Sequence, residues 1–447
     1  MDLELYQIMN KIKHIIIVLL FFVLTTSTAF ATLTLNSAGI TSDGTLTLTP
    51  ASSVTINGAL TVVGNISGTN FHFYTPTGAD GFNTFGGINA GNQTMSPGGG
   101  ASTLASYNTA FGNTSLLSNT TGSDNSAFGY KTLNLNTTGF GNAAFGDNTL
   151  STNTVGYRNV ALGMRALQFN VGGHNNVAIG FQTMRANTEG AENTAIGNVA
   201  LSANTTGANL IAVGAGALSS NTTGSSNVAV GYYALATNIT GNFNTAVGHR
   251  TLTVSTGDGN AAFGDECLWS NTTGTLNTCI GGEEGLFSNT TGSSNNAVGT
   301  DALFANTTGS ENVAVGRDAG RTAVSANANV TGSQNVWIGN NSGPGTTTQL
   351  SNAIGIGYGA LNTASNQAVL GNTSITQTLL NGNVGIGTTG PNALLHLDKG
   401  TGVGQITVDG STGGCIMLRD TDDAGWTEVD ALDGVLTASI DADGLCD

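Results

Sequence analysis

The chain has 447 residues, 66 of them glycine, and only 9% are charged, against about 25% in an average soluble domain. Its 11 basic and 27 acidic residues give a net charge of −16, which excludes the basic footprint typical of proteins that bind nucleic acid or anionic lipid. Asparagine, threonine, serine and glycine predominate instead, and these residues favour turns and stacked polar ladders.

Residues 1–31 have the order of a secretory signal peptide. Two lysines precede the apolar run Ile15–Leu24, and small polar residues lead to Ala29-Phe30-Ala31. We predict cleavage after Ala31 and a mature chain that is secreted or held at the cell surface. The alternative is an uncleaved anchor, but the apolar run is shorter than the ~20 residues that a membrane span needs.

Residues 32–82 contain short segments in which apolar and polar residues alternate, at 32–35, 45–49 and 54–56, followed by a glycine-rich stretch. Alternation with a period of two, broken by Gly, Asn and Pro, is typical of β-strands with one buried face. We therefore expect a β-rich N-terminal stem that ends in a glycine-rich linker.

Residues 83–371 are dominated by a repeat. One unit reads Asn-x-Ala-Φ-Gly-x-x-Ala-Leu-x-x-Asn-Thr-Thr-Gly-x-x, where Φ is Phe, Val, Ile or Leu. A fixed short period of this kind indicates a solenoid in which each repeat forms one coil. We predict an all-β fold, a parallel β-roll or β-solenoid built from 17-residue coils. The glycines that follow Φ at strict 17-residue steps, and that we assign to turns, are Gly112, Gly129, Gly146, Gly163, Gly180, Gly197, Gly214, Gly231 and Gly248.

The residues of one unit predict the shape of its coil. We expect Asn-x-Ala-Φ-Gly to form one strand, Ala-Leu-x-x a second, and Asn-Thr-Thr-Gly a turn. Roughly fifteen coils at ~4.8 Å each would give a rod on the order of 70 Å. Stacking also predicts an amide ladder. Its members would be Asn119, Asn136, Asn153, Asn170, Asn187, Asn204, Asn221 and Asn238.

The alternation of Φ and Ala within the first strand bears on oligomeric state. Successive side chains point to opposite faces of a strand, so one face carries bulky Φ residues and the other carries alanines. We expect Φ to fill the coil interior and the Ala face to approach another subunit. Because both faces are apolar, we predict a homo-oligomer.

The repeat core resembles a known family. Asn176-Val177-Ala178-Ile179-Gly180 and Asn227-Val228-Ala229-Val230-Gly231 are similar to the head repeats of trimeric autotransporter adhesins, the YadA-like head. The resemblance implies a homotrimeric, left-handed parallel β-roll that binds a surface receptor, a matrix protein or a glycan. The period is longer than that family's, and the Asn-Thr-Thr-Gly segment also resembles repeats of phage tail fibres. We expect no membrane-anchor domain of the family within residues 372–447.

Residues 372–447 form a different, acidic and β-rich tail. Asp441, Asp443 and Asp447 surround a glycine, and calcium prefers oxygen ligands from such loops. Solvated turns are the alternative interpretation, so we leave the metal unassigned. The letters of Gly385-x-Gly387-x-x-Gly390 match a dinucleotide fingerprint, but the following residues begin no helix.

Four cysteines in an exported chain permit three pairings. Cys415 and Cys446 share the tail, where a bridge would tie down a small module. Cys267 and Cys279 both occupy alanine positions of the repeat, and they would either bridge the coil or remain as small buried residues.

These features predict an exported structural or adhesive fibre-like protein that presents a surface for attachment to a cell or matrix. The alternative is a phage-type tail-fibre or receptor-binding scaffold, which would carry no signal peptide. The five histidines lie far apart and none has a partner at ligand spacing, so we expect neither an enzyme nor a cofactor.

Overall fold

The structure is a computed structural model in which residues 83–87, 89–91, 106–322, 324–386, 388–391, 395–397, 416–419, 426–432 and 435–441 are described. The chain divides into two compact units, 1–72 and 73–447, and all described residues belong to the second. The predicted signal peptide and the stem over 32–82 lie outside the described residues.

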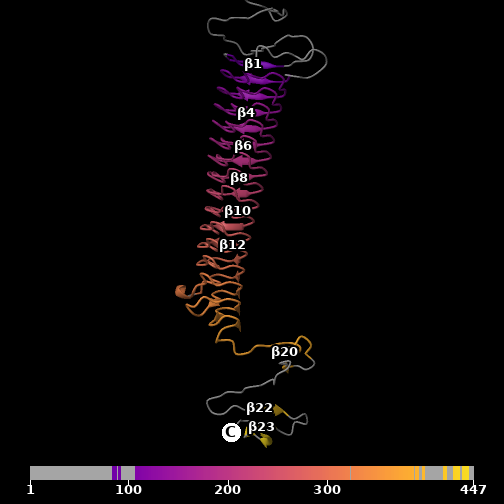
Figure 1. Cartoon of the computed structure of the whole chain (residues 1–447), viewed down its shortest axis with the longest axis vertical. Coiled ribbons are helices and arrows are strands. Elements are labelled where there is room, and N and C mark those ends of the chain that lie inside the picture. The colour runs from indigo at the N-terminus through magenta and orange to yellow at the C-terminus, as the bar shows by residue number, and fades with distance from the viewer. Residues whose placement is uncertain are drawn as a thin grey trace, which may run out of the picture. The chain divides into compact units, whose positions relative to one another are not determined.

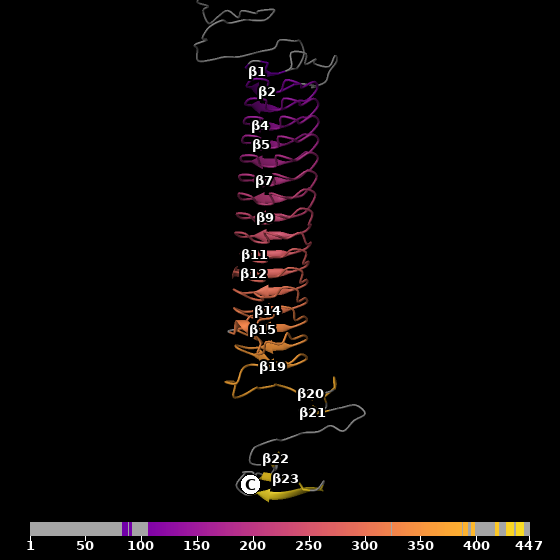
Figure 2. The ribbon, with the colours of Figure 1, turned by 60° about the vertical axis from the view of Figure 1, so that its left-hand side comes forward.

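The repeats form a parallel β-solenoid of about 15 turns, as the 17-residue period predicts. One sheet of 17 strands runs along the column, and each strand pairs in parallel with the strand of the next coil (Figures 1 and 2). The first nine strands are β1 (Thr84–Gly86), β2 (Thr109–Phe111), β3 (Ser126–Phe128), β4 (Ala143–Phe145), β5 (Val160–Leu162), β6 (Val177–Ile179), β7 (Thr194–Ile196), β8 (Ile211–Val213) and β9 (Val228–Val230). The other eight are β10 (Thr245–Val247), β11 (Ala261–Asp265), β12 (Thr278–Glu283), β13 (Asn296–Val298), β14 (Val313–Val315), β15 (Val336–Ile338), β17 (Ile354–Ile356) and β19 (Ala368–Leu370).

The prediction of two strands per coil is wrong for the regular coils, because their Ala-Leu segment forms turns. Among the described coils, a second strand forms at Gly343–Pro344 and at Leu361–Asn362. Lys131 and Leu133 both have left-handed backbone conformations, with φ of 54° and 50°, and bend the chain twice within one turn. That conformation costs a non-glycine residue about 1–2 kcal/mol. Complete burial of a leucine side chain contributes about 1.5–3 kcal/mol, which offsets the cost. Leu133 is fully buried, and its N–H donates to Thr149 O of the next coil at 3.1 Å.

The predicted orientation of the strand is also reversed. The central alanine points into the coil, where Ala127, Ala144 and Ala161 stack in register and are fully buried. The Φ residue points outward. The interior is narrow, and the turn leucines and buried asparagines already fill it, so only a small side chain fits from the strand. One exception is Trp337 in β15, which is buried in the alanine position and donates from Nε1 to Asn362 Oδ1 at 3.2 Å.

The remaining elements are short. A loop between β14 and β15 contains the 3-10 turn η1 (Ser325–Asn327), which projects from the side of the column in Figure 1. Strands β16 (Gly343–Pro344) and β18 (Leu361–Asn362) pair in parallel. In the predicted tail, β20 (Val384–Ile386) and β21 (Leu395–Leu397) are parallel. An antiparallel sheet of β22 (Ile416–Arg419), β23 (Trp426–Leu432) and β24 (Val435–Asp441) follows.

Candidate interaction surfaces of the column

Two ladders of buried asparagines hold successive coils in register. In the predicted ladder, Asn153 Nδ2 donates to Asn136 Oδ1 at 2.7 Å and to Gly156 O at 2.9 Å, and the same contacts recur along the column. The second ladder was not predicted. It is built from the first residue of Asn-x-Ala-Φ-Gly, as where Asn142 Nδ2 donates to Asn125 Oδ1 at 3.0 Å. The 17-residue spacing of these asparagines in the sequence could have predicted this ladder.

These ladders leave the Asn-Thr-Thr asparagines inaccessible. Every asparagine of the predicted ladder from Asn119 to Asn238 is fully buried. The threonine that follows also bonds along the axis, because Thr137 Oγ1 donates to Thr154 O at 2.9 Å. This segment therefore joins the coils to one another, and its asparagine amide is not exposed to a modifying enzyme.

The turn glycines are required by the stacking of the coils. The nine glycines predicted for turns have φ between 128° and 143°, which L side chains rarely adopt. A Cβ built on Gly112 would collide with the carbonyl group of Gly129 in the next coil. These residues are structural, and they sit at the end of each strand, next to the outward Φ side chain.

The outer face of the sheet is apolar along its length. The most exposed Φ side chains have 37–56% of their surface in solvent. Phe128 stacks between the rings of Phe111 and Phe145, at centroid distances of 5.4 and 4.9 Å. The outward residue before alanine adds a second apolar column in places, as at Val160 and Ile211. The most exposed Φ residues are Phe111, Phe145, Leu162, Ile196, Phe263, Ile280, Val298, Val315, Ile338, Ile356 and Leu370.

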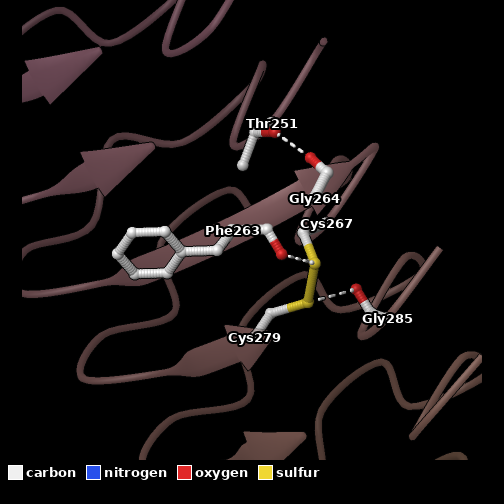
Figure 3. The surroundings of a disulfide bond; sticks show 6 residues. All are labelled: Thr251, Phe263, Gly264, Cys267, Cys279 and Gly285. Carbon is white, nitrogen blue, oxygen red and sulfur yellow. Dashed lines mark hydrogen bonds between the residues drawn. A yellow bond between two sulfur atoms is a disulfide. The ribbon is translucent and has the colours of Figure 1, made fainter. Parts of the chain in front are cut away.

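Cys267 and Cys279 form a disulfide inside the column, so the bridged alternative of the two predicted is the one observed (Figure 3). The bond links the coil of β11 to the coil of β12, with a Cα–Cα distance of 6.0 Å, and both residues are fully buried. It lies beside a change in the register of β11 and β12. Between the pairs Phe263–Ile280 and Asp265–Glu283, β12 has one residue more than β11.

A line of side chains follows one corner of the column, and we call it the corner column. Each member has φ between 47° and 70° and donates its backbone N–H to a carbonyl of the preceding coil at 2.9–3.2 Å, so the positions are equivalent. In chain order the members from Lys131 to Asp318 are Lys131, Asn148, Arg165, Gln182, Val199, Gly216, Tyr233, Arg250, Glu266, Glu284, Asp301 and Asp318, and Asn341 and Gly359 continue the column beyond them.

Charge is divided along the corner column. The first half carries the cations Lys131 and Arg165, whereas the four members from Glu266 to Asp318 are all acidic. Most of this acidic end is paired within the chain, since Arg250 lies 3.4 Å from Glu266 and Arg321 lies 2.7 Å from Asp301. Asp318 lies 3.6 Å from Arg321 and 3.7 Å from Arg317.

Glu284 has no ion-pair partner among the described residues. Burial raises the pKa of its carboxyl group, and the neighbouring charges of Asp301 and Glu266 raise that pKa further. The acidic end of the corner column therefore keeps uncompensated negative charge.

Aromatic side chains stack along other edges of the column. Tyr157 lies between Phe140 and His174 at centroid distances of 4.9 and 4.6 Å. Near the disulfide, Phe287 stacks on Phe304 at 5.4 Å, and the Arg321 guanidinium lies 4.5 Å from the Phe304 ring centroid. These rings cover one another's faces, so they stabilise the stacking of coils more than they offer a platform to a ligand.

The remaining predicted site residues lie in or beyond the tail. Asp441 is the last residue of β24, and its side chain is outside the described part, as are Asp443, Asp447, Cys415 and Cys446. Among the residues that the structure describes, no three His, Cys, Asp or Glu side chains gather as a metal site would require. Within those same ranges no helix has the length and apolar character of a membrane span.

Comparison with known proteins adds no family. No family model matches the sequence, and no curated protein matches it either.

Proposed function

We propose that this chain is an exported, non-enzymatic structural protein whose column of coils presents a surface for attachment to a cell or matrix. We propose further that three copies associate through the outer face of the sheet, as the resemblance to trimeric adhesin heads implies. The observation that carries the proposal is the outward Φ ladder, because natural surfaces seldom leave a continuous apolar stripe of this length open to water.

The ladder suits association of identical, parallel copies. Each strand from β2 to β19 in this sheet contributes its Φ side chain at the same position of the coil, so the ladder is continuous and its spacing is that of paired strands, ~4.8 Å. In a symmetric assembly each copy presents the same side chain at the same height. Phe128 of one copy would then lie level with Phe128 of the others, and the apolar area would be removed from water along the whole column.

The disulfide supports export. Disulfides form and persist in oxidising compartments and are rare in the cytosol. The Cys267–Cys279 bond is therefore consistent with the signal peptide predicted over residues 1–31. N-terminal sequencing of the protein from a secreting host tests this point: Thr32 as the first residue is the expected result, and an intact Met1 in the released protein would contradict it.

Light scattering on the purified mature chain tests the assembly. We expect three times the chain mass, and a single chain mass would refute the trimer. Phe128→Asp combined with Ile196→Asp places two charges in the outer ladder and should yield monomers. A matched control is Glu192→Lys, which changes an exposed charge away from the sheet and should leave the mass unchanged.

Adhesion is tested separately, by a binding screen of the intact assembly against matrix proteins and glycans. Saturable binding to one class is the expected result, and no binding throughout the screen would leave a scaffold role alone. The phage-type tail-fibre remains the second candidate because of the Asn-Thr-Thr-Gly segment. Such a fibre is assembled in the cytoplasm, so a processed N-terminus and an oxidised Cys267–Cys279 pair would count against it.

A further inference from the structure

The order of residues in the corner column is self-complementary when it is read against its own reverse. From Lys131 to Asp318, the first four positions carry a charged or polar donor, and the last four, counted back from Asp318, carry a carboxylate. The end-to-end pairs are Lys131 with Asp318, Asn148 with Asp301, Arg165 with Glu284, Gln182 with Glu266, Val199 with Arg250, and Gly216 with Tyr233.

We infer that the corner column is a contact surface for a second copy of this chain in antiparallel orientation, in which Lys131 meets Asp318 and Arg165 meets Glu284 of the other copy. The contact goes beyond the proposed function, since it joins one column to another through a corner that is distinct from the apolar sheet face. It requires neither a receptor nor the proposed trimer.

Equal spacing makes the antiparallel pairing possible. All twelve positions repeat the same backbone hydrogen bond to the preceding coil, so the side chains advance by one strand spacing per coil in both copies. Once one pair is aligned, the other pairs are aligned as well. Each of the unlike pairs occurs twice, because a two-fold axis relates the two copies and the interface is isologous.

The pairing contains no like charges. Lys131 and Arg165 face carboxylates, and so do the amide donors Asn148 and Gln182, which can donate to an ionised carboxylate. At the centre, the ring of Tyr233 is 40% exposed and lies over the buried Gly216 of its own chain, so the Tyr233 rings of the two copies would meet there. A parallel alignment would instead place each charge opposite itself, which is destabilising.

The positions next to the corner column agree with this orientation. The residue that precedes Lys131 is Tyr130, which is 47% exposed, and the residue that precedes Asp318 is Arg317, whose side chain is 62% exposed. In the antiparallel pair they lie opposite each other, and Arg317 comes beside a tyrosine ring that already has Lys131 Nζ 5.1 Å from its centroid. Asp147, the neighbour of Asn148, faces Thr300 and so meets no second carboxylate.

The intrachain ion pairs leave carboxylate oxygens of the corner column available to a second copy. Glu284 has no ion-pair partner among the described residues, and its pKa is raised by burial and by the adjacent carboxylates, so an incoming guanidinium would relieve repulsion there. Asp301 is paired with Arg321 through Oδ2 and retains further acceptor positions for the amide of Asn148.

Charge-reversal variants of the full mature chain test the inference. One variant carries Lys131→Glu and Arg165→Glu, and the other carries Glu284→Lys and Asp318→Lys. Sedimentation at low salt should show that the parental protein self-associates and that each variant alone does so at least about tenfold more weakly, since four surface ion pairs are lost. An equimolar mixture of the two variants should recover association, because the reversed charges are again complementary.

Salt and matched controls decide between this contact and the sheet face. Association through the corner column should weaken as salt rises from about 0.02 to 0.5 M, because exposed charges are screened over a few ångströms at high ionic strength. Arg158→Glu and Glu192→Lys, which change charges on another edge, should associate as the parental protein does. Failure of the mixture to recover association, or association that is independent of salt, would overturn the inference. The mass of the proposed trimer, measured at high salt, is unaffected by either result.

Discussion

Gly285 has no side chain where Cys279 needs space: a Cβ built on Gly285 would lie 2.6 Å from the Cys279 sulfur. Alanine occupies the equivalent position in the next coil, since the carbonyls of Gly285 and Ala302 both accept from the N–H of a buried leucine one coil earlier. The disulfide therefore requires glycine at position 285, because the Cys279 sulfur occupies the volume that an alanine methyl group would fill.

We expect Gly285→Ala to lower the free energy of unfolding by about 1–3 kcal/mol in the oxidised protein, because the added methyl overpacks the core. In a background that carries Cys267→Ala and Cys279→Ala, the same substitution should have an effect within about 0.5 kcal/mol of zero. Chemical denaturation of the four proteins measures both values. An equal loss in the two backgrounds would mean that the sulfur is not what requires the glycine.

Substitutions at neighbouring strand positions should have very different effects. Ala178 is fully buried between Ala161 and Ala195 of the adjacent coils, so Ala178→Leu should destabilise by about 1–3 kcal/mol. Ile179 faces outward, and Ile179→Leu should change stability by less than about 0.5 kcal/mol. Thermal unfolding compares them. A larger effect at residue 179 would contradict the observed orientation of the strand.

Loss of one amide should disrupt its two neighbours in the ladder. Asn153 donates to Asn136 Oδ1 and to Gly156 O and accepts from Asn170 Nδ2, so Asn153→Ala removes a partner from three buried groups. Gly156 O still accepts from Asn142 Nδ2 and Asn170 Nδ2 still donates to Gly173 O, whereas Asn136 Oδ1 loses its donor. At about 1–3 kcal/mol for the one acceptor left unsatisfied, we expect a loss of at least about 1–3 kcal/mol. The exposed Asn198 is the control, and Asn198→Ala should unfold as the parental protein does. Similar losses at both positions would refute a stabilising ladder.

The stability of the coil near Glu284 should depend on pH in a defined direction. The pKa of Glu284 is raised in the folded chain, so the folded state binds the proton more tightly than the unfolded state does. Stability contributed by this group is present below its unfolded value of 4.5 and is lost as pH rises through the raised folded value. Glu284→Gln should consequently raise the melting temperature at pH 7 and change it less at pH 4. A variant that is less stable than the parent at pH 7 would contradict this sign.

The repeat period allowed the solenoid and one amide ladder to be predicted, but it did not reveal which side of the strand faces inward. Alternation assigns Ala178 and Ile179 to opposite faces without saying which face is covered. The answer depends on the width of the interior, and that width depends on Leu201 and its equivalents, which enter the core from turns with positive φ. Leucine seldom adopts this conformation, so local propensity favoured a second strand at that position.

The candidate surfaces were predictable only in part. The disulfide was one of two alternatives for Cys267 and Cys279, because spacing alone does not show that the two side chains meet inside the column. The corner column was missed, since Lys131 and Glu284 look like isolated surface charges until the hydrogen bonds show that they occupy equivalent positions. The corner column can be recognised only when the register between each pair of neighbouring coils is known, including that of the β12 coil with its extra residue.

Equivalent bonding between neighbouring regular coils has a consequence for the length of the column. A duplicated or deleted unit leaves no donor or acceptor open, because the coils on either side of the junction meet the same partners as before. The column can therefore grow or shrink in whole steps of ~4.8 Å. A step gained or lost near Gly216 moves the two charged ends by equal amounts relative to the centre. The number of coils could thus change while the inferred antiparallel pairs stay aligned.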